Sequence, residues 1–228
     1  MYALYLIADL LLTFVFSVFI SPGCNVSDIS EHLEQTFVDG DVKMEAFPFK
    51  IGDYNEEIQK NYPGDKGLGM MLPYPDDTIA FITVYSAKDY SYAESAAVLE
   101  SESAQLRQYY SDACFNESSI ELLQANEMQT LPNGLVLPIV HTQTASHVAG
   151  AAYYYQRKHV TDEPDEWKGK EIYGVSIHQK FGLDTRFGGV LVFRELLDSN
   201  FDAPDPVDVA ASQEERLRVL NEYNHIFG

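Results

Sequence analysis

Basic side chains are scarce in this sequence. Its 228 residues include 15 Lys and Arg against 35 Asp and Glu, so the formal net charge at pH 7 is −20. Proteins that bind nucleic acid neutralise phosphates with Lys and Arg, and anionic membrane surfaces attract the same side chains. The acid excess therefore predicts no nucleic-acid partner. It indicates a solvated acidic surface that keeps the protein soluble.

Cysteine and tryptophan are also rare, with two Cys and one Trp. The sequence has no Cys-x-x-Cys or His-x-His pair, which are the spacings typical of a metal centre. Hydrophobic residues make up 46% of the chain and aromatic residues 13%, which excludes a disordered protein. The length predicts one folded domain with a single core.

The N-terminal segment is nearly free of charge. It carries only Asp9 in an apolar run that ends at Ile20, and the first basic side chain is Lys43. With no positive charge close behind the run, nothing holds the downstream chain in the cytoplasm. We therefore expect residues 1–23 to be a signal peptide or N-terminal anchor. Residues 24–228 are expected to form a single exported domain, periplasmic or membrane-tethered and facing the periplasm or exterior.

Cys24 follows this segment directly. Ser21 and Gly23 are small residues at positions −3 and −1 from Cys24, which is typical of a cleavage site, and Gly before Cys matches part of a bacterial lipoprotein box. The alternatives for Cys24 are a lipid anchor, a disulfide with Cys114, or a bystander position at the end of the signal. Membrane contact is expected only through this segment or a lipid on Cys24.

Helical patterns occupy residues 28–38, 92–110 and 212–227. The last begins with Ser212 and has Glu215 three residues later, which predicts a capping box. The long helix is acidic in its first half, in agreement with the helix dipole. Its expected apolar face consists of Ala96, Leu99, Ala104, Leu106 and Tyr110.

Strand patterns fill most of the remaining chain. Residues 43–51 predict a strand that Pro48 restricts to an edge or a bulge. A short strand is expected at residues 68–74, in a hairpin with a second strand at 78–87. The second strand is apolar on both faces, which is typical of a covered central strand. Residues 119–195 predict further antiparallel strands, with a Pro-Asn-Gly turn after the first of them.

The order of these elements predicts the fold class. Helices do not alternate regularly with strands, so a parallel sheet is excluded. We expect an α+β fold with a mainly antiparallel sheet of about 6–8 strands, on which the long helix 92–110 and the C-terminal helix 212–227 pack. This element order resembles the α/β sandwich of the Mog1/PsbP type.

Three sequence stretches carry a second resemblance. "KGLGMMLPYP", "IAFITVYSA" and the later "IHQKFGLDTRF" resemble a pattern of uncharacterised exported bacterial α+β proteins, over about residues 45–195. The resemblance implies no activity and no site residues.

Catalytic candidates are few. Three histidines, His141, His147 and His178, lie in predicted strands and form a zinc site only if those strands are neighbours; otherwise they are unrelated strand histidines with polar partners. Ser176 and His178 share one strand face, as a nucleophile and its base would, but the Gly-x-Ser-x-Gly elbow is missing. We therefore predict no catalytic site, with these four residues as the candidates that remain.

One acidic stretch resembles the start of a calcium loop. Asp198, Asn200 and Asp202 have the required spacing, but Ala203 replaces the loop glycine and Val209 the final glutamate. The prediction is a solvated acidic linker without a metal, with these three residues as the candidate ligands.

The sequence as a whole predicts an exported, non-catalytic domain that binds an unknown protein or small molecule in the cell envelope, with no cofactor. Two alternatives remain open. One is an exported hydrolase whose site is assembled from distant residues. The other is a calcium-assisted adhesion module.

Overall fold

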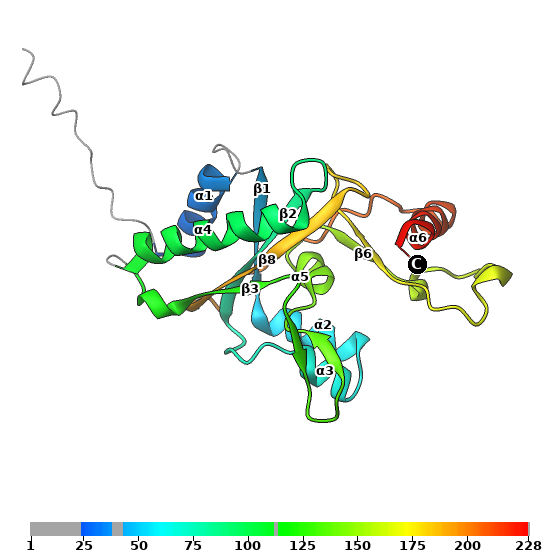
Figure 1. Ribbon diagram of the computed structural model, residues 1–228, viewed down its shortest axis with the longest axis horizontal. Helices are drawn as coiled ribbons and strands as arrows, with labels where there is room; N and C mark the ends of the chain where they lie inside the picture. The colour runs from blue at the N-terminus through cyan, green and yellow to red at the C-terminus, as the bar shows by residue number, and fades with distance from the viewer. Residues whose placement is uncertain (1–23, 38–42, 112–113, 228) are drawn as a thin grey trace, which may run out of the picture.

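A computed structural model describes residues 24–37, 43–111 and 114–227. Its centre is an antiparallel sheet of four strands in the order β1-β2-β8-β3 (Figure 1). The strands are β1 (Met44–Lys50), β2 (Thr78–Ser86), β8 (Thr185–Leu197) and β3 (Ile120–Gln124). The predicted α+β class with an antiparallel sheet is confirmed.

The other four strands of the described chain form two small antiparallel pairs, so the strands divide among three sheets. The pairs are β4 (Met128–Thr130) with β5 (Val136–Pro138), and β6 (Tyr153–Tyr155) with β7 (Val175–Ile177). The predicted Pro-Asn-Gly turn connects β4 to β5.

Strand β2 is central and buried at all nine positions, as predicted. Alternate side chains point to opposite faces of a strand. Ala80 and Ile82 therefore join one apolar cluster, and Ile79 and Phe81 join another on the other face. Pro48 lies in β1, which is an edge strand of this sheet, because proline has no N–H to donate to a second neighbour.

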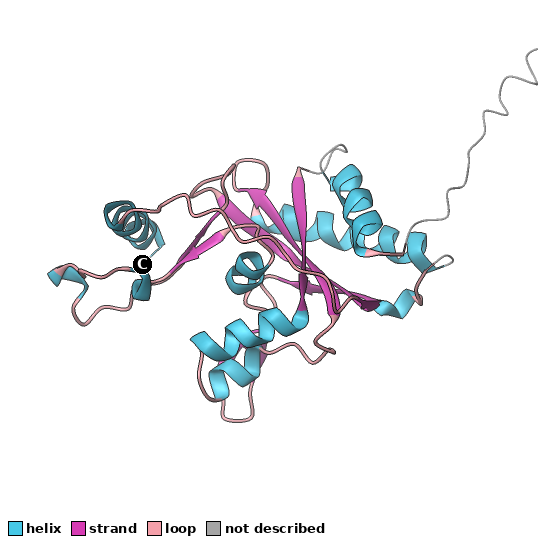
Figure 2. Ribbon diagram, turned by 180° about the vertical axis from the view of Figure 1, so that it is seen from behind, coloured by secondary structure: helices cyan, strands magenta, loops and turns pink. Residues whose placement is uncertain are grey.

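Helices cover both faces of the sheet (Figure 2). The helices on one face are α1 (Val26–Phe37) and α4 (Tyr92–Ser111). Those on the other face are α2 (Ile51–Asn61), α3 (Asp65–Met70) and α5 (Thr142–Val148). Helix α4 confirms the predicted helix, and it buries Leu99, Leu106 and Tyr110. Ala104 is exposed, because Ser103 takes the inward position instead.

The predicted strand at 68–74 and its hairpin with β2 are wrong. Helix α3 occupies the start of this segment, and β2 pairs with β1 and β8. Gly67 explains the helix: a Cβ there would come 1.8 Å from the backbone oxygen of Tyr62, so only glycine allows the chain to pack this closely. Gly67 and Met70 are then buried at helical spacing.

The predicted strand run through 135–160 is also partly wrong. Helix α5 interrupts it, and only β5 and the three-residue β6 are strands there. His141 caps α5: its side chain accepts a hydrogen bond from the backbone N–H of Thr144. Gly150, with φ of +70°, then reverses the chain toward β6.

Helix α6 (Gln213–Phe227) confirms the predicted C-terminal helix and its capping box between Ser212 and Glu215. It packs on the β6–β7 pair rather than on the central sheet (Figure 1). The connection between β6 and β7 carries two short 3-10 turns, η2 (Arg157–His159) and η3 (Asp165–Trp167). This connection buries Trp167 beneath α6.

Cys24 and Cys114 form a disulfide, with 5.5 Å between their Cα atoms, that joins the start of α1 to the end of α4. The expected signal or anchor at 1–23 lies outside the described residues. Within the described ranges, no helix is long and apolar enough to cross a membrane.

Candidate functional site

A cavity of about 720 Å³ lies where the end of α2 meets α5, the β6–β7 pair and α6. Polar and aromatic side chains dominate its wall. The phenols belong to Tyr62, Tyr154, Tyr173 and Tyr223, and the amides to Asn61, Gln143 and Gln156. A cavity of this size, with aromatic faces and a few convergent polar groups, is typical of a small-molecule site.

Three side chains in the wall form a continuous chain of hydrogen bonds. Nε2 of His141 lies 3.2 Å from the Tyr62 hydroxyl, which lies 3.2 Å from the Tyr154 hydroxyl. Burial, followed by the positive charge of Lys66, lowers the pKa of His141 to about 4, so the imidazole is neutral. Its Nδ1 accepts from the Thr144 N–H, so Nε2 carries the proton and donates to Tyr62. Tyr62 can then donate to Tyr154 or to a ligand.

A second cavity, of about 230 Å³, shares Gln143 and Tyr223 with the first. Ser176 lies in its wall, directly opposite Tyr154 in the β6–β7 pair, so the two side chains share one face of the ribbon. The Ser176 hydroxyl is buried and has no hydrogen-bond partner among the described residues. A buried donor without a partner is costly, and a bound ligand can satisfy it.

The predicted nucleophile–base pair of Ser176 and His178 does not form, because the serine hydroxyl contacts no base in the described chain. The ring of His178 instead packs against Phe47 and Phe181. Its Nε2 lies 3.5 Å from a carboxylate oxygen of Glu45. Burial lowers the pKa of His178, although Glu45 opposes the shift.

The three candidate zinc histidines lie in separate surroundings. His141 lines the 720 Å³ cavity, His178 packs beside Glu45, and His147 accepts a hydrogen bond from the Tyr154 N–H at the far end of α5. No group of three metal-ligating side chains exists within the described parts of the chain.

The candidate calcium residues lie in a chain segment without helix or strand. Asp198 accepts a hydrogen bond from the N–H of Asn200, which is a local turn. Asp202 lies instead at an acidic hollow beside Asp53 and His147. The two carboxylates therefore belong to different surroundings.

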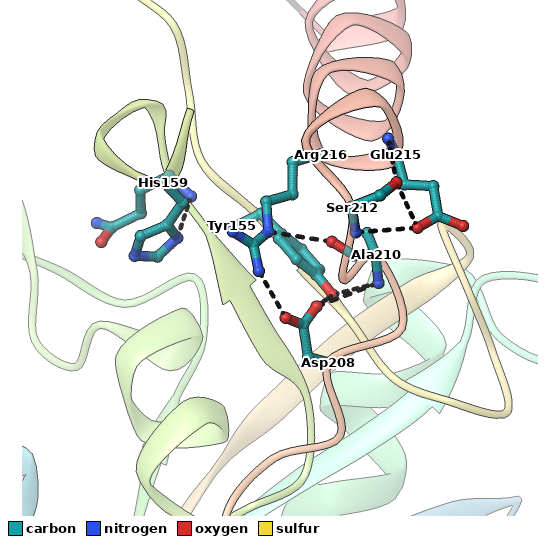
Figure 3. Close-up of polar contacts among 8 residues, drawn as sticks. Tyr155, His159, Asp208, Ala210, Ser212, Glu215 and Arg216 are labelled. Atoms are coloured by element: carbon teal, nitrogen blue, oxygen red, sulfur yellow. Dashed lines mark hydrogen bonds and ion pairs between the residues drawn. The ribbon is translucent and has the colours of Figure 1, made fainter. Parts of the chain in front are cut away.

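A polar cluster fastens α6 to β6 (Figure 3). Asp208 accepts from the Tyr155 hydroxyl at 2.6 Å and from the Arg216 guanidinium at 2.8 Å. Partial burial opposes the charge on Asp208, but these two hydrogen bonds outweigh it, and the pKa of this carboxyl lies below its ordinary value. Helix α6 carries Tyr223, so the cluster holds one wall of both cavities in place.

Of the residues that line the 720 Å³ cavity, only His141 was a candidate from the sequence. Tyr62, Gln143 and Tyr154 come from three separate elements, and no short motif unites them. The signal that was available is the density of polar and aromatic residues in 141–157, where one helix cap, one glycine turn and three consecutive tyrosines follow each other.

Comparisons with known proteins identify relatives over nearly the whole described chain. The model of the MMACHC family, "Methylmalonic aciduria and homocystinuria type C family", matches residues 43–227. A cyanocobalamin reductase / alkylcobalamin dealkylase of Gallus gallus is 33% identical over 192 residues, covering 81% of this chain and 76% of the relative. The protein of the same name from Danio rerio is 31% identical, covering 79% of this chain and 72% of the relative.

A solved structure has a similar fold. The crystal structure of a Caenorhabditis elegans B12-trafficking protein, CblC, superposes with a TM-score of 0.62 at 22% identity. The superposition covers 87% of this chain and 81% of that chain.

These relatives overturn the predicted resemblance, the predicted location and the predicted function. The resemblance to exported bacterial proteins is wrong, because the relatives are animal proteins. The periplasmic or envelope location is wrong as well, because it was predicted for an exported bacterial protein and the relatives are animal proteins. The non-catalytic role and its hydrolase and adhesion alternatives are wrong, because the relatives are named for chemistry on cobalamin. The location had been predicted from the apolar run before Cys24, which lies outside the described residues.

Proposed function

This chain belongs to the methylmalonic aciduria and homocystinuria type C family, and we propose that it binds cobalamin and removes the ligand on the upper face of the cobalt. Cyanide would leave by reduction and an alkyl group by dealkylation, the two activities for which the relatives are named. The observation that carries the proposal is the 720 Å³ cavity lined by phenols and amides, all within the residues that the family model matches.

The lining suits the chemistry of a corrinoid. The corrin ring is broad and flat, with neutral amide side chains around its edge. Aromatic faces such as those of Tyr62 and Tyr154 can pack against the ring, and the amide of Gln143 can pair with the amides of the edge. The smaller cavity adds the partnerless hydroxyl of Ser176 on the same face. The sequence left open whether the partner is a protein or a small molecule, and we propose the small molecule.

Among the described residues that line the cavity, the histidine does not offer a ligand to the cobalt. His141 is the histidine of the cavity wall, and its Nε2 donates to Tyr62, so the imidazole has no lone pair for the metal. Its role is to orient the Tyr62 hydroxyl. Cobalamin is the substrate here, and the cobalt enters and leaves with it.

The reaction needs a second reactant. Alkyl removal transfers the alkyl group from cobalt to a nucleophile, and the cobalt keeps both electrons of the broken bond. Both cysteines of the chain are joined in the disulfide, so the protein has no thiol to accept the group. The acceptor must therefore come from solution, and a thiolate is a strong nucleophile of the kind this transfer needs. Reduction of cyanocobalamin takes an electron from an external donor, and cyanide leaves with its electron pair.

Absorption titration of cyanocobalamin with the purified protein tests the binding step. We expect saturable spectral change with one corrinoid per chain. Gln143→Leu should weaken binding about tenfold, because it leaves a ligand amide unpaired in a buried site. Tyr109→Phe, on the exposed side of α4, is the control and should bind as the wild type does. Absence of any saturable change with the wild type would contradict the proposed function.

A further inference from the structure

Positive charge gathers at one place on this acidic chain. The wall of the 720 Å³ cavity includes Lys66, Arg157 and Lys158 against a single acid, Glu171. The chain as a whole has more than twice as many acids as bases. The cavity therefore reverses the sign of charge found over the rest of the molecule.

The three cations differ in their partners. Arg157 is paired with Glu163, and its charge is already compensated. Lys66 and Lys158 have no carboxylate oxygen within 4.0 Å anywhere in the described ranges. Two ammonium groups in an acidic protein thus remain available to an anion.

The two lysines contact consecutive residues of the cavity wall. The Lys158 ammonium donates to the side-chain oxygen of Asn61. The Lys66 ammonium lies over the ring of Tyr62, 5.1 Å from its centroid. Asn61 and Tyr62 are consecutive residues at the end of α2, so α2 brings together a lysine from α3 and a lysine from η2.

We infer that Lys66 and Lys158 bind the phosphodiester of the nucleotide loop of cobalamin, an inference that rests on the proposed function. The amides of the corrin edge are neutral, so the phosphodiester is the one ionised group of the molecule away from the cobalt. A lysine ammonium is a compact point charge that suits a phosphate oxygen. These two lysines of the cavity wall then select a complete cobalamin over a corrinoid that lacks the loop.

The test compares cobalamin with cobinamide, which has the same corrin ring but no nucleotide loop. Dissociation constants are measured for the wild type, Lys66→Gln, Lys158→Gln and the double variant. Each single variant should bind cobalamin roughly fivefold more weakly, and the double variant more weakly still, as for partly exposed ion pairs. Cobinamide affinity should stay unchanged in all of them. Lys43→Gln, at an exposed site beside Asp89, is the control and should bind both corrinoids as the wild type does.

Salt and phosphate complete the test. Raising the salt concentration should weaken cobalamin binding to the wild type more than to the double variant, because exposed charges are screened. Inorganic phosphate should compete with cobalamin and spare cobinamide.

Equal loss of both corrinoids in the lysine variants, or no loss of either, would overturn the inference while the proposed function stands. The inference also fails if inorganic phosphate binds the wild type but the lysine variants keep full cobalamin affinity. The lysines would then bind free phosphate and not the phosphodiester of cobalamin. Failure of the wild type to bind either corrinoid would overturn the proposed function itself.

Discussion

Tyr155 donates a hydrogen bond from its hydroxyl to Oδ1 of Asp208 at 2.6 Å, and the same hydroxyl accepts one from the backbone N–H of Ala210 at 2.8 Å (Figure 3). Tyr155 is fully buried in β6, while Asp208 and Ala210 belong to the segment before α6. Burial, and then the bond to Asp208, raises the pKa of Tyr155, so it stays a donor. Helix α6 supplies Tyr223 to the wall of the 720 Å³ cavity. The hydrogen bond between Tyr155 and Asp208 therefore helps to hold this wall in position.

Removing the Tyr155 hydroxyl should loosen α6. Tyr155→Phe removes one hydrogen bond from Asp208 and one from the Ala210 N–H, which keeps only its 3.2 Å bond to Oδ1 of Asp208. The free energy of unfolding should fall by about 1–3 kcal/mol. Corrinoid affinity should fall as well, because the Tyr223 wall moves. Chemical denaturation and absorption titration measure the two effects. Glu222→Gln, which breaks only the exposed pair with Arg218, is the control and should change stability by less than about 0.5 kcal/mol.

Ser176→Ala should stabilise the protein in the absence of ligand. The substitution removes a buried hydroxyl that lacks a partner, so the free energy of unfolding should rise by about 1 kcal/mol. The same variant should bind cobalamin more weakly, because the ligand loses a donor. Ser146 is the matched control: its buried hydroxyl donates to the Gln143 carbonyl, and Ser146→Ala should destabilise. Thermal unfolding with and without cobalamin distinguishes the two, and a destabilised Ser176→Ala would contradict the assignment.

Stability should fall as the solution is acidified from about pH 6.5 toward pH 4. The folded-state pKa of His141 is about 4, below its ordinary value, so the unfolded chain takes up a proton in this range that the folded chain refuses. The stabilisation is complete above the unfolded pKa and is lost as the pH falls through the folded one. His141→Asn keeps a helix-capping acceptor and should reduce the pH slope by up to one proton. Burial also lowers the pKa of His147 and His178, so part of the slope should remain.

Gly174→Ala should damage the large cavity. A Cβ at this position would come 2.5 Å from a ring carbon of Tyr154 and 2.8 Å from the backbone oxygen of Tyr155. The Tyr154 ring must then leave its place in the wall, and corrinoid affinity should fall by roughly tenfold or more. Gly169→Ala is the control, because nothing lies within 4 Å of its Cβ position, although its positive φ adds a small backbone cost. Equal affinities for the two variants would place Tyr154 outside the binding surface.

Local patterns in the sequence predicted much of the fold. Strand β2 is apolar on both faces, α4 has helical spacing of its apolar residues, and Ser212 with Glu215 marks the start of α6. Each of these signals is contained in fewer than about twenty residues. The predicted strand at 68–74 was wrong because Gly67 packs against the Tyr62 carbonyl. Such a packing contact is not visible in the periodicity of the sequence.

The site could not be predicted in the same way. His141 bonds to Tyr62 across 79 positions, and Tyr62 bonds to Tyr154 across 92. Only the folded chain brings these residues together. The net charge of −20 also gave no sign of a local positive site. Lys66 and Lys158, which lack a carboxylate partner among the described residues, lie in the wall of the cavity.

The most direct test of the proposed function is anaerobic incubation of the wild-type protein with methylcobalamin and an added thiol, followed by absorption of the corrinoid and by mass spectrometry of the thiol. We expect loss of methylcobalamin with formation of one methyl thioether for each corrinoid dealkylated, and a much slower reaction with Gln143→Leu. Methylcobalamin that binds to the protein but loses its methyl group no faster than in protein-free solution would contradict it.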